Sequence, residues 1–317
     1  MFTEAQKNKV IETWGRSVCL KILREIDLYS EKWRLYDITF FEHYSMNAIF
    51  YCKSALYGDC ALKISGGYQN AEFVSEYNVL REYNGRRFAR VLASDIDLEA
   101  GKKAMLIERV FPGNRLDDEK SPEKRLAAFS ELFNGMHIKP ENPALYIKYE
   151  DKLTGSANYA RGRKGCEDLY AHIVKAQGVY ADISAAYRDE ALLHGDLNCN
   201  NILLKDNGKY IAVDPQGLVG AYVFDIPRYI LIEFYSSPDI SAEKRAGRIN
   251  GIIEYLESSL NVPGKIIGQC FYVETVIYES WSATVNTYSI DNIIFAEMIM
   301  KKLTYSPAND IFREQSG

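Results

Sequence analysis

The chain has 317 residues, a length that usually requires two hydrophobic cores or one core with a sizeable insertion. Hydrophobic residues make up 47% of it and charged residues 26%, which is typical of globular proteins and excludes a disordered or fibrous chain. The net charge of -5 offers no general positive field to a polyanion, so we expect no nucleic-acid partner, whereas a cationic ligand is compatible with it.

The six cysteines and four histidines are scattered and show neither a C-x-x-C pair nor the spacing of zinc ligands. We therefore expect small buried thiols in a reducing compartment. Glu4 and Lys7 stand where a secretion signal needs an apolar segment, and no apolar run reaches the ~18 residues that cross a bilayer. These features predict a cytoplasmic protein, monomeric or homodimeric, with no membrane-spanning segment.

The first part of the chain alternates between helical and strand patterns. Apolar residues at helical spacing between residues 3 and 29 predict one or two helices, with a break near Gly15. Residues 35–65 are rich in aromatic and β-branched residues and predict strands, with a turn at residues 57–59. A helix over 70–83 and two strands joined by a turn at 99–101 complete a predicted antiparallel sheet that holds one helix.

The break at residues 111–114 is the predicted boundary between two lobes, and helical patterns dominate after it. We expect helices from Ser121 onward and over 167–188, 241–259 and 291–303. Residues 201–214 interrupt them with a hairpin pattern around Asn207-Gly208. The predicted fold class is α+β, with a sheet-rich N-terminal lobe of residues 1–110 and a helical C-terminal lobe of residues 111–317.

The segment from residue 192 to 217, LLHGDLNCNNILLKDNGKYIAVDPQG, has the spacing of a phosphotransfer site. Asp196 is followed five positions later by Asn201, and Asp214 lies 18 positions beyond Asp196. Phosphoryl transfer needs a carboxylate that orients the attacking hydroxyl, and a carboxylate and an amide oxygen that hold Mg²⁺ against the phosphates. A single such residue near a turn is usually a turn residue, but three at the spacing of a kinase catalytic loop favour function.

The motifs HGDLNCNNIL and DPQGLVGAYVFD resemble the aminoglycoside phosphotransferase family, and within it the branch that modifies streptomycin and hydroxyurea. The similarity extends upstream to EYNVLREYNGRRFARVLASD and AMLIERVFPGNRL and covers roughly residues 35–235. Asn198, Cys199 and Asn200 replace the His-Pro-Gly that is usual in the loop, at positions without a phosphate or metal role.

The resemblance implies a protein-kinase-like two-lobed fold that uses ATP and Mg²⁺. It assigns Asp196 as the catalytic base and Asn201 and Asp214 as Mg²⁺ ligands. Other implied roles concern nucleotide binding and support of the loop: Lys63 contacts the α- and β-phosphates, Glu76 holds Lys63, the backbone around Glu108 and Val110 reads adenine, and His194 and Asp225 order the catalytic loop. The loop that would cover the phosphates, residues 52–58, has a single glycine, and Ser54 is the predicted β-phosphate contact there.

The acceptor is expected to bind in the helical lobe. Candidate acids are Asp117, Asp118, Glu119, Glu233, Glu274 and Glu279, and candidate stacking residues are Tyr278 and Trp281. A cluster of such acids, of which we single out Glu233, Glu274 and Glu279 together with Trp281, would suit a polycationic acceptor. The alternative for each acid is a solvated helix face.

The sequence therefore predicts an ATP-dependent phosphotransferase that acts on a hydroxyl of a small molecule, with a streptomycin-like aminoglycoside and antibiotic resistance as the leading prediction. A metabolic small-molecule kinase of the same fold is an alternative. A non-catalytic nucleotide-binding regulator is another, although Lys63, Asp196, Asn201 and Asp214 are all present. A protein kinase is disfavoured because no A-P-E element follows Asp214 and Asp225 comes only eight residues after Gly217.

Overall fold

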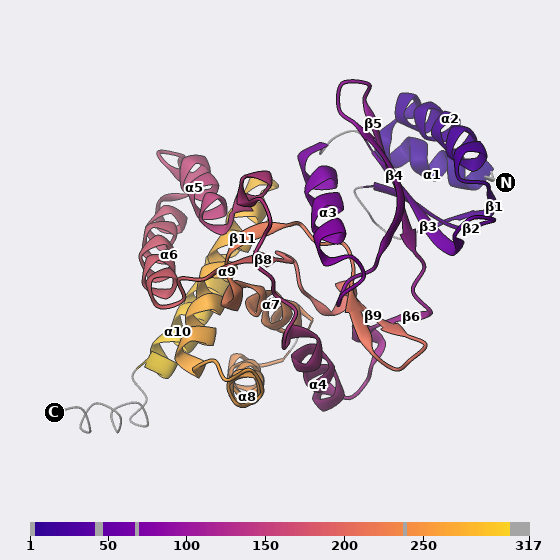
Figure 1. Ribbon diagram of the computed structural model, residues 1–317. Helices are drawn as coiled ribbons and strands as arrows, with labels where there is room; N and C mark the ends of the chain where they lie inside the picture. The colour runs from indigo at the N-terminus through magenta and orange to yellow at the C-terminus, as the bar shows by residue number, and fades with distance from the viewer. Residues whose placement is uncertain (1–3, 42–46, 67–69, 237–239, 305–317) are drawn as a thin grey trace. The chain divides into compact units, whose positions relative to one another are not determined.

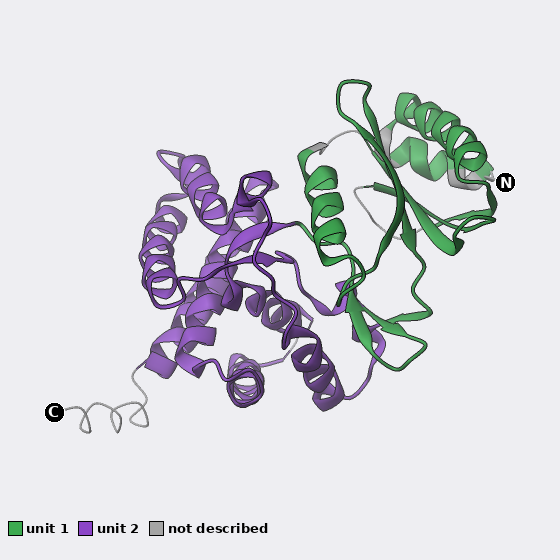
Figure 2. Cartoon of the chain, viewed as in Figure 1, with its two compact units in different colours: residues 1–114, 203–216 green, residues 115–202, 217–317 purple. Residues whose placement is uncertain are grey.

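The computed structural model describes residues 4–41, 47–66, 70–236 and 240–304. The chain divides into two compact units, shown in different colours in Figure 2 and by element in Figure 1. Unit 1 consists of Met1–Asn114 and Leu203–Gln216, and unit 2 of Arg115–Ile202 and Gly217–Gly317. The first crossing between units therefore falls at the segment that the sequence marks as the lobe boundary.

Unit 1 is built on a five-stranded antiparallel sheet in the order β1-β2-β3-β5-β4. Its strands are β1 (Leu35–Phe40), β2 (Asn47–Ser54), β3 (Gly58–Ser65), β4 (Val91–Asp97) and β5 (Lys102–Glu108). Gly58 has a φ of +76°, which allows the short turn between β2 and β3 that residues 57–59 predict. The predicted antiparallel sheet is confirmed.

The two faces of this sheet have different chemistry. Helices α1 (Glu4–Trp14) and α2 (Arg16–Lys32), separated at Gly15 with a φ of +87°, share one apolar core with Phe50, Leu62 and Ile64. Because side chains alternate along a strand, Lys63 lies on the opposite face from Leu62 and Ile64. Helix α3 (Asn70–Tyr83) packs against β4 and β5 in the same unit.

The hairpin after the predicted catalytic loop belongs to unit 1. Strands β9 (Ile202–Lys205) and β10 (Tyr210–Ala212) form a small sheet with β6 (Pro112–Arg115) in the order β10-β9-β6. Ala212 also forms a parallel bridge with Phe88, and its amide donates to the carbonyl of Arg87. These backbone pairings explain why residues 203–216 group with the N-terminal unit, although the sequence assigned them to the helical lobe.

Unit 2 is mostly helical and is organised around α9 (Gly264–Thr284), which packs against α5, α6, α7, α8 and α10. The other helices are α4 (Pro122–Phe133), α5 (Tyr149–Ala160), α6 (Glu167–Ala186), α7 (Pro227–Tyr235), α8 (Ala242–Leu260) and α10 (Ile290–Thr304). Sequence patterns indicated no range for α5, α7 or α9. Helix α9 is buried on most of its circumference and lacks the amphipathic period that marks surface helices.

A short sheet in the order β7-β11-β8 completes unit 2, from β7 (Ile147–Lys148), β8 (Glu190–Leu193) and β11 (Leu218–Ala221). Two single-turn helices, η3 (Cys199–Asn201) and η4 (Tyr222–Asp225), follow β8 and β11 along the chain. The described residues contain no helix that is long and apolar enough to cross a membrane. The α+β fold, with a sheet-rich N-terminal region and a mostly helical remainder, is confirmed.

Candidate functional site

The start of the loop of residues 194–201 in unit 2 is bound by Asp225, whose side chain has no exposed surface. Its two carboxylate oxygens accept hydrogen bonds from the backbone amides of His194 and Gly195, both at 2.8 Å, and Oδ2 also lies 2.9 Å from Nε2 of His137. Burial alone would raise the pKa of Asp225, but the contacts with His137 and Gly195 hold it below its ordinary range. A buried anion therefore fixes the start of the loop.

Strand pairing explains why Asp225 reaches this position. Leu218 and Val219 of β11 pair with Leu193 and Leu192 of β8, so the turn η4 that follows β11 is carried to the loop that follows β8. The ring of His194 is fully buried, and its Nδ1 accepts the amide of Asp196 at 3.2 Å. This contact is of the kind expected from a residue that orders the loop.

The carboxylate of Asp196 stands in a network of side-chain donors. Oδ1 accepts from Nε and Nη2 of Arg228, at 2.7 and 2.6 Å, and from Nδ2 of Asn198 at 3.0 Å. Oδ2 accepts from Nδ2 of Asn201 at 3.0 Å. The Asp196 side chain keeps 21% of its surface exposed, so solvent reaches the carboxylate at the position of the predicted base.

Arg228, on α7, is a residue that the sequence analysis missed. Its Nη1 lies 3.6 Å from the carboxylate of Glu274, and its guanidinium lies 5.7 Å from the ring centroid of Tyr278. Burial would lower the pKa of Arg228, but the carboxylates of Asp196 and Glu274 raise it above its ordinary value, so it stays charged. No motif marks it in the sequence, because it contacts a residue 32 positions upstream through tertiary packing.

The amide of Asn201 is oriented for a cation. Its Nδ2 donates both to the carbonyl oxygen of Asp196, at 2.9 Å, and to the Asp196 carboxylate. The reverse orientation would place the amide oxygen against two acceptors, so Oδ1 is the atom turned away from them. Amide and carboxylate oxygens are ligands that Mg²⁺ accepts.

Unit 1 holds the predicted phosphate-binding lysine between two carboxylates. Nζ of Lys63 lies 2.7 Å from Oε1 of Glu76 and forms a second ion pair with Asp214. The side chains of Lys63 and Glu76 are 4% and 6% exposed, whereas that of Asp214 is 56% exposed. The 13-residue separation between strand and helix therefore brings Lys63 and Glu76 into direct contact.

Charge and burial act against each other in this group. Burial would lower the pKa of Lys63, but Asp214 and Glu76 together raise it, so the side chain stays an ammonium ion. Burial raises the pKa of Glu76, and Lys63 opposes that shift. Asp214 follows β10 with a φ of +58°, a left-handed conformation that Asp tolerates better than most residues, and its carboxylate is more exposed than that of Glu76.

The oxygen donors of Asp214 and Asn201 are of the kind that Mg²⁺ prefers. Among the described residues, no group of three or more His, Cys, Asp or Glu side chains could hold a metal ion. Mg²⁺ commonly takes one or two protein ligands and completes its shell with water and substrate phosphates. Asp214 and Asn201 offer a carboxylate and an amide oxygen of this kind, and their role as Mg²⁺ ligands stays a prediction.

The remaining nucleotide-binding residues lie at the ends of unit 1 strands. Ser54 is buried at the end of β2, where its Oγ donates to the Trp33 carbonyl at 2.7 Å and accepts the amide of Leu56. The hydroxyl therefore stabilises the turn, and its phosphate contact stays a prediction. Glu108 ends β5, with its amide bonded to the Arg90 carbonyl at 2.9 Å, and Val110 follows two residues later; the structure does not test their contact with adenine.

The three acids predicted to bind the acceptor are buried and have protein partners. Glu233 pairs with Arg125, at 2.9 Å, and with Arg248. Glu274 accepts from the Tyr149 hydroxyl and faces Arg228. Glu279 accepts from the Tyr235 hydroxyl, and from the Asn292 amide and the Ser289 backbone at 2.7 Å.

The acids are therefore not solvated helix faces, and a ligand cation would have to compete with these partners. Their role in acceptor binding stays a prediction. Trp281 differs from them, because its side chain is 62% exposed and lies 6.1 Å from the Tyr278 ring. Of the four residues singled out for the acceptor, Trp281 is the one that presents a large surface to solvent.

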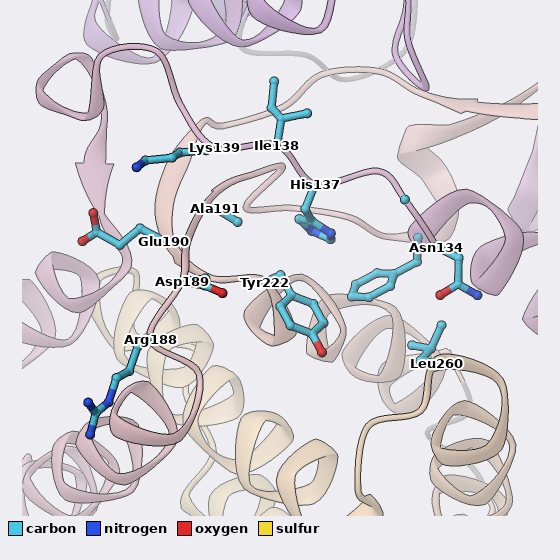
Figure 3. A pocket seen from close by; sticks show the side chains of 12 residues that line it. Asn134, His137, Ile138, Lys139, Arg188, Asp189, Glu190, Ala191, Tyr222 and Leu260 are labelled. Carbon is cyan, nitrogen blue, oxygen red and sulfur yellow. The ribbon is translucent and has the colours of Figure 1, made fainter.

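Unit 2 also has an open cavity of about 780 Å³ beside His137 (Figure 3). His137 and Tyr222 lie next to each other in its wall, with ring centroids 5.8 Å apart. Asn134, Lys139, Arg188 and Glu190 add polar and charged groups to the lining. None of the lining residues is a predicted phosphate, metal or acceptor contact, and His137 also contacts Asp225, which binds the loop that carries Asp196.

Comparison with known proteins gives a family and a fold. The model of the aminoglycoside/hydroxyurea antibiotic resistance kinase family matches residues 58–286. None of the curated proteins compared matches the chain. An ethanolamine kinase from Plasmodium vivax has a similar fold, with a TM-score of 0.59 at 12% identity over 98% of this chain and 95% of that chain.

Two further small-molecule kinases have similar folds. The amicoumacin kinase hAmiN, solved in complex with AMP-PNP, Ca²⁺ and Ami, gives a TM-score of 0.58 at 14% identity over 88% of this chain and 92% of that chain. The aminoglycoside phosphotransferase APH(4)-Ia, solved with ADP and hygromycin B, gives 0.54 at 14% identity over 89% and 98%. At these identities the structures demonstrate a shared fold.

The Lys63–Glu76 pair predicts a pH-dependent loss of stability in Lys63→Met. Glu76 has a raised pKa in the folded protein, so its favourable contribution is present at low pH and is lost as the pH rises through the folded value. Without Lys63 that loss grows, because the buried carboxylate has no opposite charge beside it. We expect a destabilisation of about 3 kcal/mol at pH 8 and a much smaller one at pH 5, measured by urea unfolding.

The matched control for this prediction is Lys63→Met combined with Glu76→Gln, which removes the buried charge. Relative to Glu76→Gln alone, the double variant should show little pH dependence. Equal destabilisation of Lys63→Met at pH 5 and pH 8 would contradict the assignment.

Replacement of Asp225 by Asn should destabilise unit 2 by about 2–4 kcal/mol at pH 7, since an amide cannot accept from both loop amides and also face His137. The pKa of Asp225 is lowered on folding, so the stability it supplies is present above its ordinary value and is lost as the pH falls through the folded one. The difference between parent and variant should therefore shrink below about pH 4. Thermal unfolding followed by circular dichroism measures it, and identical melting of both proteins at pH 7 would disprove the bracing role.

Proposed function

Because the chain belongs to the aminoglycoside/hydroxyurea antibiotic resistance kinase family, we propose that it transfers the γ-phosphoryl group of ATP to a hydroxyl of a small molecule. The observation that carries the proposal is the partly exposed Asp196 carboxylate, held on a braced loop next to the oriented amide of Asn201. A streptomycin-like aminoglycoside is the acceptor that we propose first, with antibiotic resistance as the biological role and the cytoplasm as the location.

In this proposal Asp196 orients the acceptor hydroxyl and accepts its proton. The hydroxyl oxygen then forms a bond to the γ-phosphorus while the bond from that phosphorus to the β,γ-bridging oxygen breaks, and ADP leaves. The carboxylate is suited to this task because its geometry is fixed before the acceptor arrives, which lowers the cost of alignment. The proton on Asp196 is released to solvent after the phosphorylated product has left.

Lys63 is the proposed contact of the α- and β-phosphates. It is a charged ammonium group held against Glu76, and Asp214 is its second, more exposed partner. Phosphate oxygens would take the place of Asp214 at Lys63, and the freed carboxylate would then ligate Mg²⁺ together with Asn201. The ion supplies charge neutralisation at the β- and γ-phosphates. Similar structures solved with ADP, and with AMP-PNP and Ca²⁺, support a nucleotide and a divalent cation.

The test is a phosphorylation screen with radiolabelled ATP across aminoglycosides, amino alcohols and small polyols, using the parent protein and Asp196→Ala. We expect transfer to at least one acceptor by the parent and a loss of about 10³-fold or more in kcat in the variant, with Mg-ATP affinity nearly unchanged. Near-parental turnover in Asp196→Ala would overturn the base assignment.

The screen also separates the alternatives. Transfer only to amino alcohols or polyols would identify a metabolic small-molecule kinase. Tight Mg-ATP binding without transfer to any acceptor would favour a nucleotide-binding regulator and would refute the proposed kinase activity.

Asp214→Ala should weaken Mg-ATP binding by about 10-fold or more, because the variant loses a metal ligand. In the presence of a chelator, ATP affinity should change much less, since Lys63 and Glu76 are intact. Calorimetric titration in both conditions separates the two effects. Unchanged affinity in Mg²⁺ would refute the ligand role of Asp214.

A further inference from the structure

We propose that Arg228 is a positioning residue that holds Asp196 by one carboxylate oxygen and leaves the other oxygen for the acceptor hydroxyl. This inference rests on the proposed function, because it concerns the same carboxylate. Arg228 lies outside the motifs that mark the loop, and its role follows from the contacts of the two oxygens of Asp196.

The two oxygens of Asp196 have different environments. Oδ1 accepts from two nitrogens of Arg228 and from the amide of Asn198, so its acceptor capacity is filled. Oδ2 accepts from the amide of Asn201 and retains a lone pair. Because Asp196 is 21% exposed, an incoming hydroxyl can reach the carboxylate, and Oδ2 is the oxygen with capacity to accept it.

A second layer of contacts fixes Arg228 itself. Its side chain is 16% exposed, and its Nη1 faces Glu274, which is 2% exposed on α9. Glu274 in turn accepts a hydrogen bond from the hydroxyl of Tyr149, on α5. The guanidinium therefore stands between two carboxylates and is held by groups from the helical core, so it has little freedom to turn away from Asp196.

Asp225 and Arg228, which bind the backbone and the side chain of the same loop, lie close together in the chain. Asp225, which binds the loop backbone, and Arg228, which binds the Asp196 side chain, are three residues apart, at the passage from η4 to α7. Residues at this spacing lie on the same side of a helical turn. One short segment therefore fixes both the backbone of the loop and the rotation of its carboxylate.

A lysine cannot reproduce this geometry. Arg228 uses Nε and Nη2 on one carboxylate and Nη1 on the other, a planar fork that a single ammonium group lacks. A purely electrostatic role would be largely kept by Arg228→Lys, whereas a positioning role would not. The two variants Arg228→Lys and Arg228→Ala therefore distinguish the two explanations.

The experiment measures kcat, the KM of the acceptor and the Kd of Mg-ATP for both variants. We expect kcat to fall by about 10-fold in Arg228→Lys and about 100-fold in Arg228→Ala, with Mg-ATP affinity within twofold of the parent. Guanidinium chloride at tens of millimolar should restore part of the kcat of Arg228→Ala, because the free ion can occupy the vacated site. Arg125→Ala is the matched control, since Arg125 also pairs with a buried glutamate, Glu233, but neither hydrogen-bonds nor forms an ion pair with Asp196.

The control should lose stability similarly, keep its kcat and show no rescue. A kcat of Arg228→Ala within twofold of the parent, or equal rescue of Arg125→Ala, would overturn the proposal.

A readout without turnover separates this proposal from the proposed function. The Nε–H signal of Arg228 in ¹H–¹⁵N spectra, assigned by its loss in Arg228→Lys, should be protected from exchange in the parent and should shift and lose protection in Asp196→Asn. If the parent transfers no phosphate to any acceptor but the signal behaves in this way, the kinase proposal fails and the positioning role of Arg228 stands. If the signal does not respond to Asp196→Asn, the positioning role is refuted whatever the activity.

Discussion

The conformation of the loop of residues 194–201 in unit 2 depends on one buried anion, the carboxylate of Asp225. It accepts from two consecutive backbone amides and lies within hydrogen-bonding distance of His137, so it fixes the backbone at the start of the loop. A carboxylate can be buried at this position because its acceptor sites are satisfied there, which compensates for lost hydration. The buried strands β8 and β11 pair with each other and bring the loop after β8 next to the turn η4 after β11. The hydrogen bonds of Asp225 then fix the conformation of that loop.

In both units a cationic side chain lies between two carboxylates that differ in their exposure to solvent. In unit 1 the cation is Lys63, with buried Glu76 and exposed Asp214. In unit 2 it is Arg228, with buried Glu274 and partly exposed Asp196. In each case the buried acid pairs with the cation, and the second acid is the more exposed of the two. The same pattern therefore orients an exposed or partly exposed carboxylate through a cation that is itself held by a buried one.

Local patterns predicted the strands and the single helix between them in unit 1 and several helices of unit 2, because strand alternation, turn residues and amphipathic spacing are encoded by neighbouring residues. The same patterns indicated no range for α5, α7 or α9. Tertiary pairing was not visible in the same way. Arg228 and His137 carry no motif, and the sequence gives no indication that they meet Asp196 and Asp225. Glu233, Glu274 and Glu279 lie on helices whose partners are chosen by packing, so their burial could not be read from charge alone. Helix α9 escaped prediction since burial removed its amphipathic signature.

Because residues 203–216 belong to unit 1, this unit cannot be complete when the first 114 residues have been synthesised. A nascent chain that has emerged only to Asn114 has the five-stranded sheet and Lys63, but it lacks β9, β10 and Asp214. Domains generally fold as units, N-terminal first, while the ribosome is still elongating the chain. Here unit 1 is complete only when Gln216 has emerged, and by then the first segment of unit 2, Arg115–Ile202, has already been synthesised. Folding of the two units is thus interleaved in time, and a fragment cut at residue 114 would be an unfinished unit.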